Sequence, residues 1–342
     1  MHRSKPNLFD WATSELSQDA ILCWLAAWAD PGAAECDLLL HKLGHNLIAL
    51  IFAKHRRELP DQLTSIEIMR QHHNIDVLAI VDKTLAVCIE DKIESTEHSD
   101  QLRRYLASLG EDGFSRDRLL PTYIQCGEQG DYRDVLDAGY VIVRRRELVA
   151  LLRNYLSEGG TNSIGRDFHD YLAKLETKYE SFRHLPPAEW DSYAWQGYYS
   201  TLQEVLGEGE WGYVPQPTGG FWGYWLHSHC DSDCEQYLQI QERNLCFKIS
   251  VEEKDNRCEG RSKWSEKILA AAITENLNVV RPRRFGNGQT MTVAMLSGDF
   301  PVVNSSGSLD LEATVAVLRR AITVLDRAAK PSLAAAASAH GE

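Results

Sequence analysis

The sequence contains 342 residues, enough for one large domain or two smaller ones, and this length excludes peptide hormones and small disulfide scaffolds. Hydrophobic residues make up 44% and charged residues 25% of the chain, so most of it should fold as a soluble globular protein. The formal net charge of -13 argues against a protein that coats nucleic acid without selectivity, although it does not exclude a nucleic-acid enzyme.

No apolar stretch approaches the about 20 residues that a helix needs to span a bilayer, and the segment 20–29 is short enough for a buried helix. We therefore expect a cytoplasmic protein with no membrane partner. The eight cysteines are scattered along the chain, several of them in apolar contexts. We expect reduced thiols rather than a disulfide framework.

Apolar residues at helical spacing predict two N-terminal helices, over residues 13–29 and 36–57. Three short β-rich runs follow at 64–69, 75–81 and 85–89, and their succession predicts a meander. In the second run apolar side chains point to both sides, so helices should cover both faces of the sheet. The remaining elements of this α/β core are a helix at 99–109, strands at 119–126 and 140–143, and a helix at 146–156.

A loop at 159–162 that contains two glycines marks a boundary. Beyond it the sequence predicts a charged helix, an aromatic-rich helix, and four strands between 211 and 251 that should form a second, antiparallel sheet. Two further short strands and two helices follow. We therefore expect an N-terminal core over 1–158, a C-terminal α+β region over 159–330 and a disordered tail over 331–342.

Two carboxylates and a lysine stand out on the predicted strands. Glu90 and Lys92 are two residues apart, so on a strand they project from one face while Asp91 points away. A three-residue loop at 82–84 would place Asp76 opposite Glu90 on that face, because a slip of one residue would change faces.

Two carboxylates brought this close repel each other unless a cation lies between them. Oxygen ligands of this type suit Mg²⁺ or Mn²⁺. The metal would polarise a phosphate and activate water, while Lys92 would orient that water or stabilise the developing negative charge. The pattern therefore indicates metal-assisted phosphodiester hydrolysis.

Residues 74–76 (Asn-Ile-Asp), followed by 89–93 (Ile-Glu-Asp-Lys-Ile), resemble the motif of the PD-(D/E)XK nuclease superfamily. Gln101 and Tyr105, four apart on the next predicted helix, strengthen the resemblance, as does a first helix with the sequence of residues 13–19. The chain departs from the pattern in lacking a proline before Asp76. The resemblance covers roughly residues 7–150 and implies a restriction-endonuclease-like α/β core, a mixed sheet flanked by helices.

The resemblance also implies roles for individual residues. The expected metal ligands are Asp76, Glu90, the carbonyl of Asp91, and Glu15 from the first helix, with Asp19 as second choice for the last. Lys92 would be the catalytic lysine. Gln101 and Tyr105 would contact substrate or orient Lys92.

By this resemblance we expect a Mg²⁺-dependent or Mn²⁺-dependent endonuclease or exonuclease of bacterial type that acts on DNA, in defence against phage and other foreign DNA or in repair. The alternative is a catalytically silent nucleic-acid or ligand-binding sensor that keeps the nuclease fold. A homodimer, and a partner protein bound through the C-terminal region, stay open.

Other signals have simpler interpretations. A zinc site built from His227, His229, Cys230 and Cys234, completed by Cys246 or Cys258, is outweighed by a polar loop between strands. The basic runs 144–146 and 281–284 could meet phosphates but favour a solvated surface, as does the pair at 72–73. The aromatic residues between 190 and 225 favour a core over a base-stacking platform.

Overall fold

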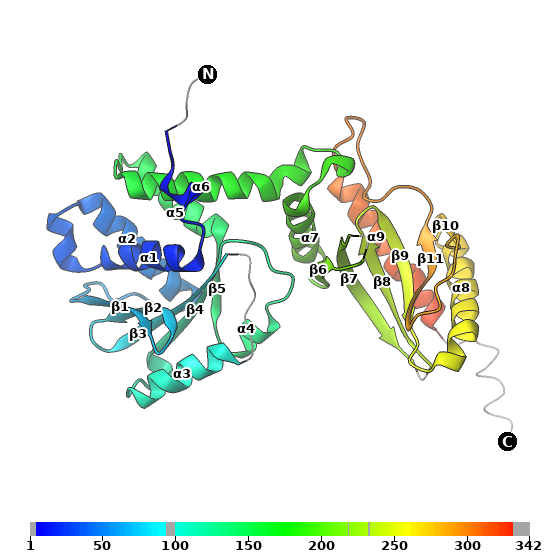
Figure 1. Ribbon diagram of the computed structural model, residues 1–342, viewed down its shortest axis with the longest axis horizontal. Coiled ribbons are helices and arrows are strands. Elements are labelled where there is room, and N and C mark those ends of the chain that lie inside the picture. The colour runs from blue at the N-terminus through cyan, green and yellow to red at the C-terminus, as the bar shows by residue number, and fades with distance from the viewer. Residues whose placement is uncertain (1–4, 94–99, 218, 232, 331–342) are drawn as a thin grey trace. The chain divides into compact units, whose positions relative to one another are not determined.

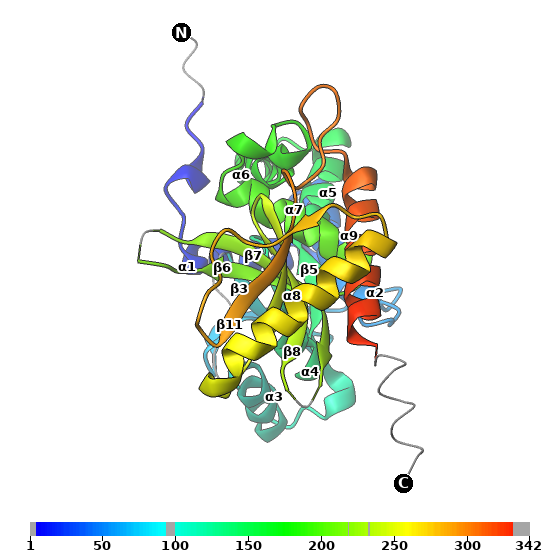
Figure 2. The same ribbon diagram turned by 90° about the vertical axis from the view of Figure 1, so that its right-hand side faces the viewer.

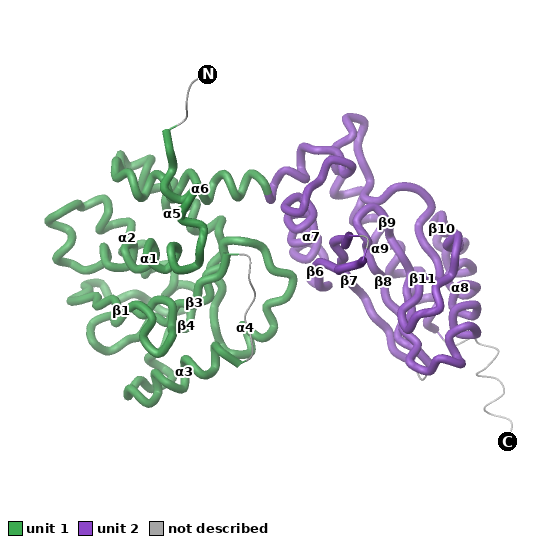
Figure 3. The backbone as a smooth tube through the Cα atoms, in the orientation of Figure 1, with its two compact units in different colours: residues 1–178 green, residues 179–342 purple. Residues whose placement is uncertain are grey.

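The computed structural model describes residues 5–93, 100–217, 219–231 and 233–330. The chain divides into two compact units, Met1–Lys178 and Tyr179–Glu342, which Figure 3 shows in separate colours. Among the helices of the described ranges, none is both long and apolar enough to cross a membrane. The expected tail at 331–342 lies outside the described residues.

The first unit contains a mixed five-stranded sheet with the order β1-β2-β3-β4-β5 (Figure 1). The first three strands are antiparallel neighbours, and β3, β4 and β5 run parallel. Its strands are β1 (Ile66–His72), β2 (Ile75–Val81), β3 (Leu85–Lys92), β4 (Leu119–Gln125) and β5 (Val141–Arg144). Its helices are α1 (Glu15–Ala27), α2 (Leu38–Lys54), α3 (Gln101–Glu111), α4 (Arg133–Asp137), α5 (Arg145–Ser157) and α6 (Ser163–Tyr179).

Helices cover both faces of this sheet, as the apolar pattern of β2 predicted. Val77, Ala79 and Val81 join the hydrophobic cluster formed with α1, α2, α5 and α6. Leu78 and Ile80 join the cluster on the opposite face, to which α3 and α4 contribute. Alternate residues of one strand thus serve two cores, so the sheet is the rigid middle layer of the unit.

The two hairpins of the meander fix the register of the sheet. His73 and Asn74 join β1 to β2 with positive φ angles of 52° and 66°, the backbone of a two-residue type I′ turn. The loop between β2 and β3 has the predicted three residues, because Val81 pairs with Leu85. Val77 pairs with Ile89, so the residue before Val77 lies opposite the residue after Ile89.

The boundary between the units differs from the expected one. It falls after Lys178 rather than after residue 158, so α6 is grouped with the first unit. The reason is packing: Phe168 and Leu172 of α6 lie in the same hydrophobic cluster as α1, α2 and α5. Lys5 also forms an ion pair with Asp167 at 3.0 Å.

The short helix α4, between β4 and β5, was not predicted.

The second unit contains an antiparallel six-stranded sheet with the order β10-β11-β9-β8-β7-β6. Its strands are β6 (Glu210–Val214), β7 (Phe221–Cys230), β8 (Glu235–Gln241), β9 (Asn244–Ser250), β10 (Val279–Val280) and β11 (Thr290–Leu296). Its helices are α7 (Ser192–Leu206), α8 (Arg257–Thr274) and α9 (Leu311–Ala329). Figure 2 shows α8 beside α9 and β11, with which it packs. The predicted second antiparallel sheet is therefore confirmed.

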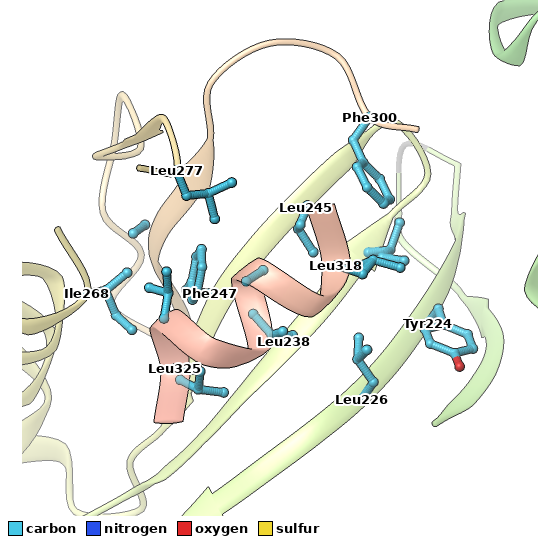
Figure 4. Packing of buried hydrophobic residues seen from close by; sticks show 14 of the residues in the cluster. Tyr224, Leu226, Leu238, Leu245, Phe247, Ile268, Leu277, Phe300, Leu318 and Leu325 are labelled. Atoms are coloured by element: carbon cyan, nitrogen blue, oxygen red, sulfur yellow. The ribbon is translucent and has the colours of Figure 1, made fainter. Parts of the chain in front are cut away.

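One hydrophobic cluster joins this sheet to its helices. Figure 4 shows Leu238 and Phe247 of the sheet with Ile268 of α8 and with Leu318 and Leu325 of α9. The aromatic residues considered between 190 and 225 mostly belong to this core, as predicted; the buried ones in that range are Trp190, Trp195, Tyr198, Tyr199, Trp211 and Tyr224. All eight cysteines lie in the described ranges, and each is a free thiol.

Candidate active site

Asp76 and Glu90 lie on neighbouring strands and face the same side of the sheet. Glu90 is fully buried at the end of β3, and Asp76 is half-buried at the start of β2. Oδ2 of Asp76 accepts a hydrogen bond of 2.9 Å from the backbone amide of Asp91. The structure therefore brings the two carboxylates together in the way that the three-residue loop predicted.

Lys92 completes the group from the same face of β3. Its Nζ donates to Oε1 of Glu90 at 2.6 Å and to the backbone carbonyl of Asp91 at 3.2 Å. Oε2 of Glu15, in the first turn of α1, lies 3.8 Å from the same nitrogen. The ammonium thus lies among oxygen atoms from two strand residues and one helix.

The side chain of Asp91 points to the opposite face of the sheet, as alternation requires. Its Oδ1 accepts a hydrogen bond of 2.5 Å from Nε2 of Gln18, which also contacts Sγ of Cys126 at 3.0 Å. All three side chains are buried. Burial raises the pKa of Asp91 well above its ordinary value, and the Gln18 amide opposes that shift. At the site itself, Asp91 offers its backbone groups.

Both acidic residues predicted from the first helix lie close to this group. Ser14 is the N-cap of α1, so Glu15 stands in the first turn and Asp19 one turn later. Asp19 is buried, and Nε2 of Gln71 bridges it to Asp76, at 3.3 Å from Asp19 Oδ2 and 3.4 Å from Asp76 Oδ1. Gln71 lies at the end of β1, and nothing in the sequence marked it as a site residue.

The first residues of α3 contact Glu90 on the face of the sheet that α3 covers. Nε2 of Gln101 donates to Oε1 of Glu90 at 3.1 Å and also forms a hydrogen bond with the hydroxyl of Tyr105. Leu102 and Leu109 anchor α3 in the hydrophobic cluster on that face. Gln101 and Tyr105 are thus brought to the site as predicted, with Gln101 in contact with Glu90.

Burial and mutual repulsion shape the protonation of these groups. Burial, followed by the neighbouring Asp76 carboxylate, raises the pKa of Glu90 to about 8, and Lys92 opposes this shift. The same two causes raise the pKa of Asp19 to about 6. Burial lowers the pKa of Lys92, but Glu90 and the other carboxylates outweigh it, so its pKa is raised and the ammonium persists.

The oxygen atoms of this group fit a hard divalent cation. Within the described part of the chain, Oε2 of Glu90 and Oδ1 of Asp19 are buried without a hydrogen-bond donor. Both atoms belong to carboxylates that interact with Asp76: Gln71 bridges Asp19 to Asp76, and the charge of Asp76 raises the pKa of Glu90. Carboxylate and carbonyl ligands of this kind suit Mg²⁺ or Mn²⁺.

Two other signals from the sequence have structural roles. Arg145, in the middle of the basic run 144–146, is buried and pairs with Glu128 at 2.7 Å and Glu176 at 2.5 Å. It therefore holds α5 to α6 rather than facing solvent. The adjacent histidines at 72 and 73 both contact the carboxylate of Asp112, at the end of α3.

Residues 50–142 match the family model described as the PD-(D/E)XK nuclease superfamily. The matched segment contains β1 to β4 and α3, and with them Asp76, Glu90 and Lys92. The part of the chain that carries the carboxylate pair is thus similar to this superfamily. Comparisons with curated proteins and with solved structures give no match.

Proposed function

We propose that this protein is a metal-dependent nuclease that hydrolyses phosphodiester bonds of DNA. The observation that carries the proposal is the arrangement of Asp76, Glu90 and Lys92 on adjacent strands, with Lys92 Nζ 2.6 Å from Glu90. It lies within the segment that matches a nuclease superfamily. The buried, unpaired Oε2 of Glu90 supports a cation at this place.

Asp76, Glu90 and the carbonyl of Asp91 would hold a Mg²⁺ or Mn²⁺ ion, with Glu15 as a further ligand. When bound, the ion would polarise the scissile phosphate and lower the pKa of a coordinated water. Asp19 is the alternative acidic ligand from α1, because it is buried and Gln71 bridges it to Asp76. Glu15 is favoured because it lies nearer to Lys92.

The surrounding side chains would position this chemistry. Lys92 stays protonated beside Glu90, so it can stabilise negative charge that develops on a phosphate oxygen. Gln101 holds Oε1 of Glu90 and thereby fixes the direction of Oε2. Tyr105 would orient Gln101 and would affect the carboxylate only through it.

We propose that residues 1–158 hold the catalytic core. We propose that residues 159–330 supply substrate recognition or a partner surface, except for α6, which packs on the core. The net charge of -13 favours selective over indiscriminate DNA binding. A nuclease of this kind suits defence against foreign DNA, or repair.

The test is cleavage by the full-length chain of plasmid, linear duplex DNA, single-stranded DNA and RNA, each with Mg²⁺, Mn²⁺ or EDTA. Wild type is compared with Glu90→Gln, which keeps the volume of the side chain and removes its charge. Glu111→Gln is the matched control, because Glu111 is an exposed carboxylate at the end of α3.

We expect metal-dependent cutting of DNA by wild type and by Glu111→Gln, and none by Glu90→Gln. Cutting by Glu90→Gln at the wild-type rate would refute the site. Cutting of RNA alone would refute the DNA substrate. No cutting by wild type under any condition would refute the nuclease in favour of a catalytically silent binding protein.

A further inference from the structure

We propose that His227, His229 and Asp326 in the second unit form a site for a first-row transition metal ion of the Zn²⁺ class. Nε2 of His227 lies 2.6 Å from Oδ1 of Asp326, and Nε2 of His229 lies 2.7 Å from the same oxygen. The ligand atoms of the three residues all lie within 4.8 Å of one another. Two residues come from β7 and the third from α9, far along the chain.

A β-bulge in β7 creates this convergence. The pairing of β7 with β8 shifts by one residue between Leu226 and His229. In an unbroken strand, His229 would lie on the face opposite to Leu226. The shift instead places His229 beside Gln236, a buried residue on the same side of β8 as Leu238. The bulge thus turns His229 toward α9.

The backbone of His227 contributes to the same turn. Its φ angle is 52°, in the left-handed region that residues other than glycine seldom adopt. Leu226 and Leu325, which precede His227 and Asp326, both face the hydrophobic core in Figure 4. The polar residues that follow them therefore meet at the edge of that core, where α9 packs on β8, the neighbour of β7. Strained backbone that gathers such side chains is typical of binding sites.

A second carboxylate lies near the other ring nitrogen of His227. Oε1 of Glu208 lies 3.7 Å from Nδ1 of His227, whereas Nε2 of that ring points to Asp326. In metal sites, a histidine ligand commonly gives its other ring nitrogen to a carboxylate, which fixes the orientation of the ring. Glu208 is the carboxylate that would take this role for His227.

The donor set defines the class of ion. Two imidazoles with one carboxylate suit Zn²⁺ and its neighbours, whereas Mg²⁺ prefers oxygen ligands alone. Three protein ligands leave a fourth position for water. In a tetrahedral zinc centre the ligand atoms lie about 3.3 Å apart. Binding would therefore lengthen the two short contacts with Asp326 and bring the ligand atoms, which all lie within 4.8 Å of one another, to this common spacing.

The two cysteines that follow these histidines in the sequence take other partners. Cys230 Sγ lies 3.8 Å from the carbonyl of Asp231, and Cys234 Sγ lies 3.2 Å from Nε2 of Gln236. Asp326 replaces them in the proposed site, and no pattern in the sequence pairs it with the histidines. The ion would link β7 to α9 and so stabilise the second unit.

The test is zinc binding by the full-length chain in excess Mg²⁺, which occupies oxygen-only sites. We would measure zinc per chain after removal of free metal, the affinity by competition with a chromophoric chelator, and the rise in Tm on adding Zn²⁺. The variant is His227→Gln/His229→Gln. The matched control is His72→Gln/His73→Gln, which removes the two imidazoles of the comparable triplet with Asp112 in the first unit.

We expect the His227→Gln/His229→Gln variant to bind one zinc fewer than wild type and to lose a zinc-dependent rise in Tm that the control variant keeps. Glu208→Gln should retain the stoichiometry and weaken zinc binding about 10-fold to 100-fold. If the double variant fails to fold, Asp326→Asn, at a half-exposed position of α9, takes its place. Zinc binding equal to wild type in these variants would overturn the proposal.

Discussion

The backbone amide of Asp91 donates a hydrogen bond of 2.9 Å to Oδ2 of Asp76, and this contact ties the two strands of the site together. The side chains of three consecutive residues of β3 lie on alternate faces of the sheet. Glu90 and Lys92 face the site, while the Asp91 side chain lies on the opposite face against Gln18. A substitution at Asp91 therefore changes the charge on the opposite face of the sheet without removing a side chain from the site.

Asp91→Asn should stabilise the protein and leave cleavage close to the wild-type rate, because only the backbone of this residue lies at the site. Burial raises the pKa of Asp91 in the folded state above its unfolded value of about 3.9. A carboxyl group whose pKa is higher in the folded state contributes to stability at pH values below its pKa in the unfolded state. This contribution is lost as the pH rises through its pKa in the folded state. The advantage of asparagine, about 1–3 kcal/mol, should thus grow with pH.

Urea unfolding of both proteins at about pH 5 and about pH 8 measures that difference. An advantage of asparagine that shrinks with rising pH would mean that the Asp91 carboxylate is stabilised in the fold. Loss of cleavage in Asp91→Asn would mean that its side chain takes part in the chemistry.

Lys92→Met should abolish cleavage and also weaken the fold. It removes the cation that pairs with the fully buried Glu90, and breaking such a pair lowers the free energy of unfolding by up to about 3–5 kcal/mol. Protonation of Glu90, whose pKa is already raised to about 8, reduces that cost. The double variant Lys92→Met/Glu90→Gln should regain most of the stability and none of the activity.

Chemical denaturation of the single and double variants forms a mutant cycle that isolates the pair. Additive effects would show that Lys92 and Glu90 are not energetically coupled. Cleavage by Lys92→Met at the wild-type rate would remove Lys92 from the mechanism.

Gln101→Leu should slow cleavage about tenfold with little change in stability, because it removes one hydrogen bond to Glu90 while Lys92 still holds the same oxygen. Tyr105→Phe should have a smaller effect, since Tyr105 reaches Glu90 only through Gln101. Cleavage rates measured under single-turnover conditions give the order of the two. A larger loss in Tyr105→Phe than in Gln101→Leu would assign Tyr105 a direct contact with substrate.

Gly44→Ala should displace α1 and so reduce cleavage from a distance. A Cβ at Gly44 in α2 would lie 2.5 Å from the carbonyl oxygen of Leu25 and 2.6 Å from the amide of Ala29, both backbone atoms that cannot yield easily. The expected loss of stability is about 1–3 kcal/mol. Because α1 carries Glu15 and Asp19, the same shift should lower the cleavage rate.

The control is Gly110→Ala in α3, where a Cβ would meet nothing within 4 Å. That variant should be neutral or more stable by up to about 1 kcal/mol. Thermal unfolding and cleavage compare the two glycines. Equal behaviour would contradict the close crossing of α1 and α2.

The sequence predicted the parts of the site that depend on local rules. Strand alternation and the length of the loop at 82–84 placed Asp76 opposite Glu90, and the family resemblance pointed to Glu15, Gln101 and Tyr105. The sequence could not predict contacts between distant segments, such as that of Gln18 with Asp91 or of Asp326 with the histidines of β7.

Burial of charged residues was equally hidden from the sequence. Arg145 stands in a basic run that looks like surface, yet its partners Glu128 and Glu176 come from a loop and from α6. The packing of α6 on the first unit also explains why that unit extends to Lys178. Both outcomes depend on tertiary contacts that periodicity does not encode.

The most direct test of the central claim is single-turnover cleavage of duplex DNA across a Mg²⁺ series by wild type and Asp76→Asn, with Mg²⁺ binding followed by calorimetry. Asparagine keeps an oxygen acceptor for the Asp91 amide and removes the charge at the proposed metal site. We predict Mg²⁺-dependent cleavage by wild type, and loss of both Mg²⁺ binding and cleavage in Asp76→Asn with the fold retained. Unchanged Mg²⁺ binding and cleavage in Asp76→Asn would contradict the account.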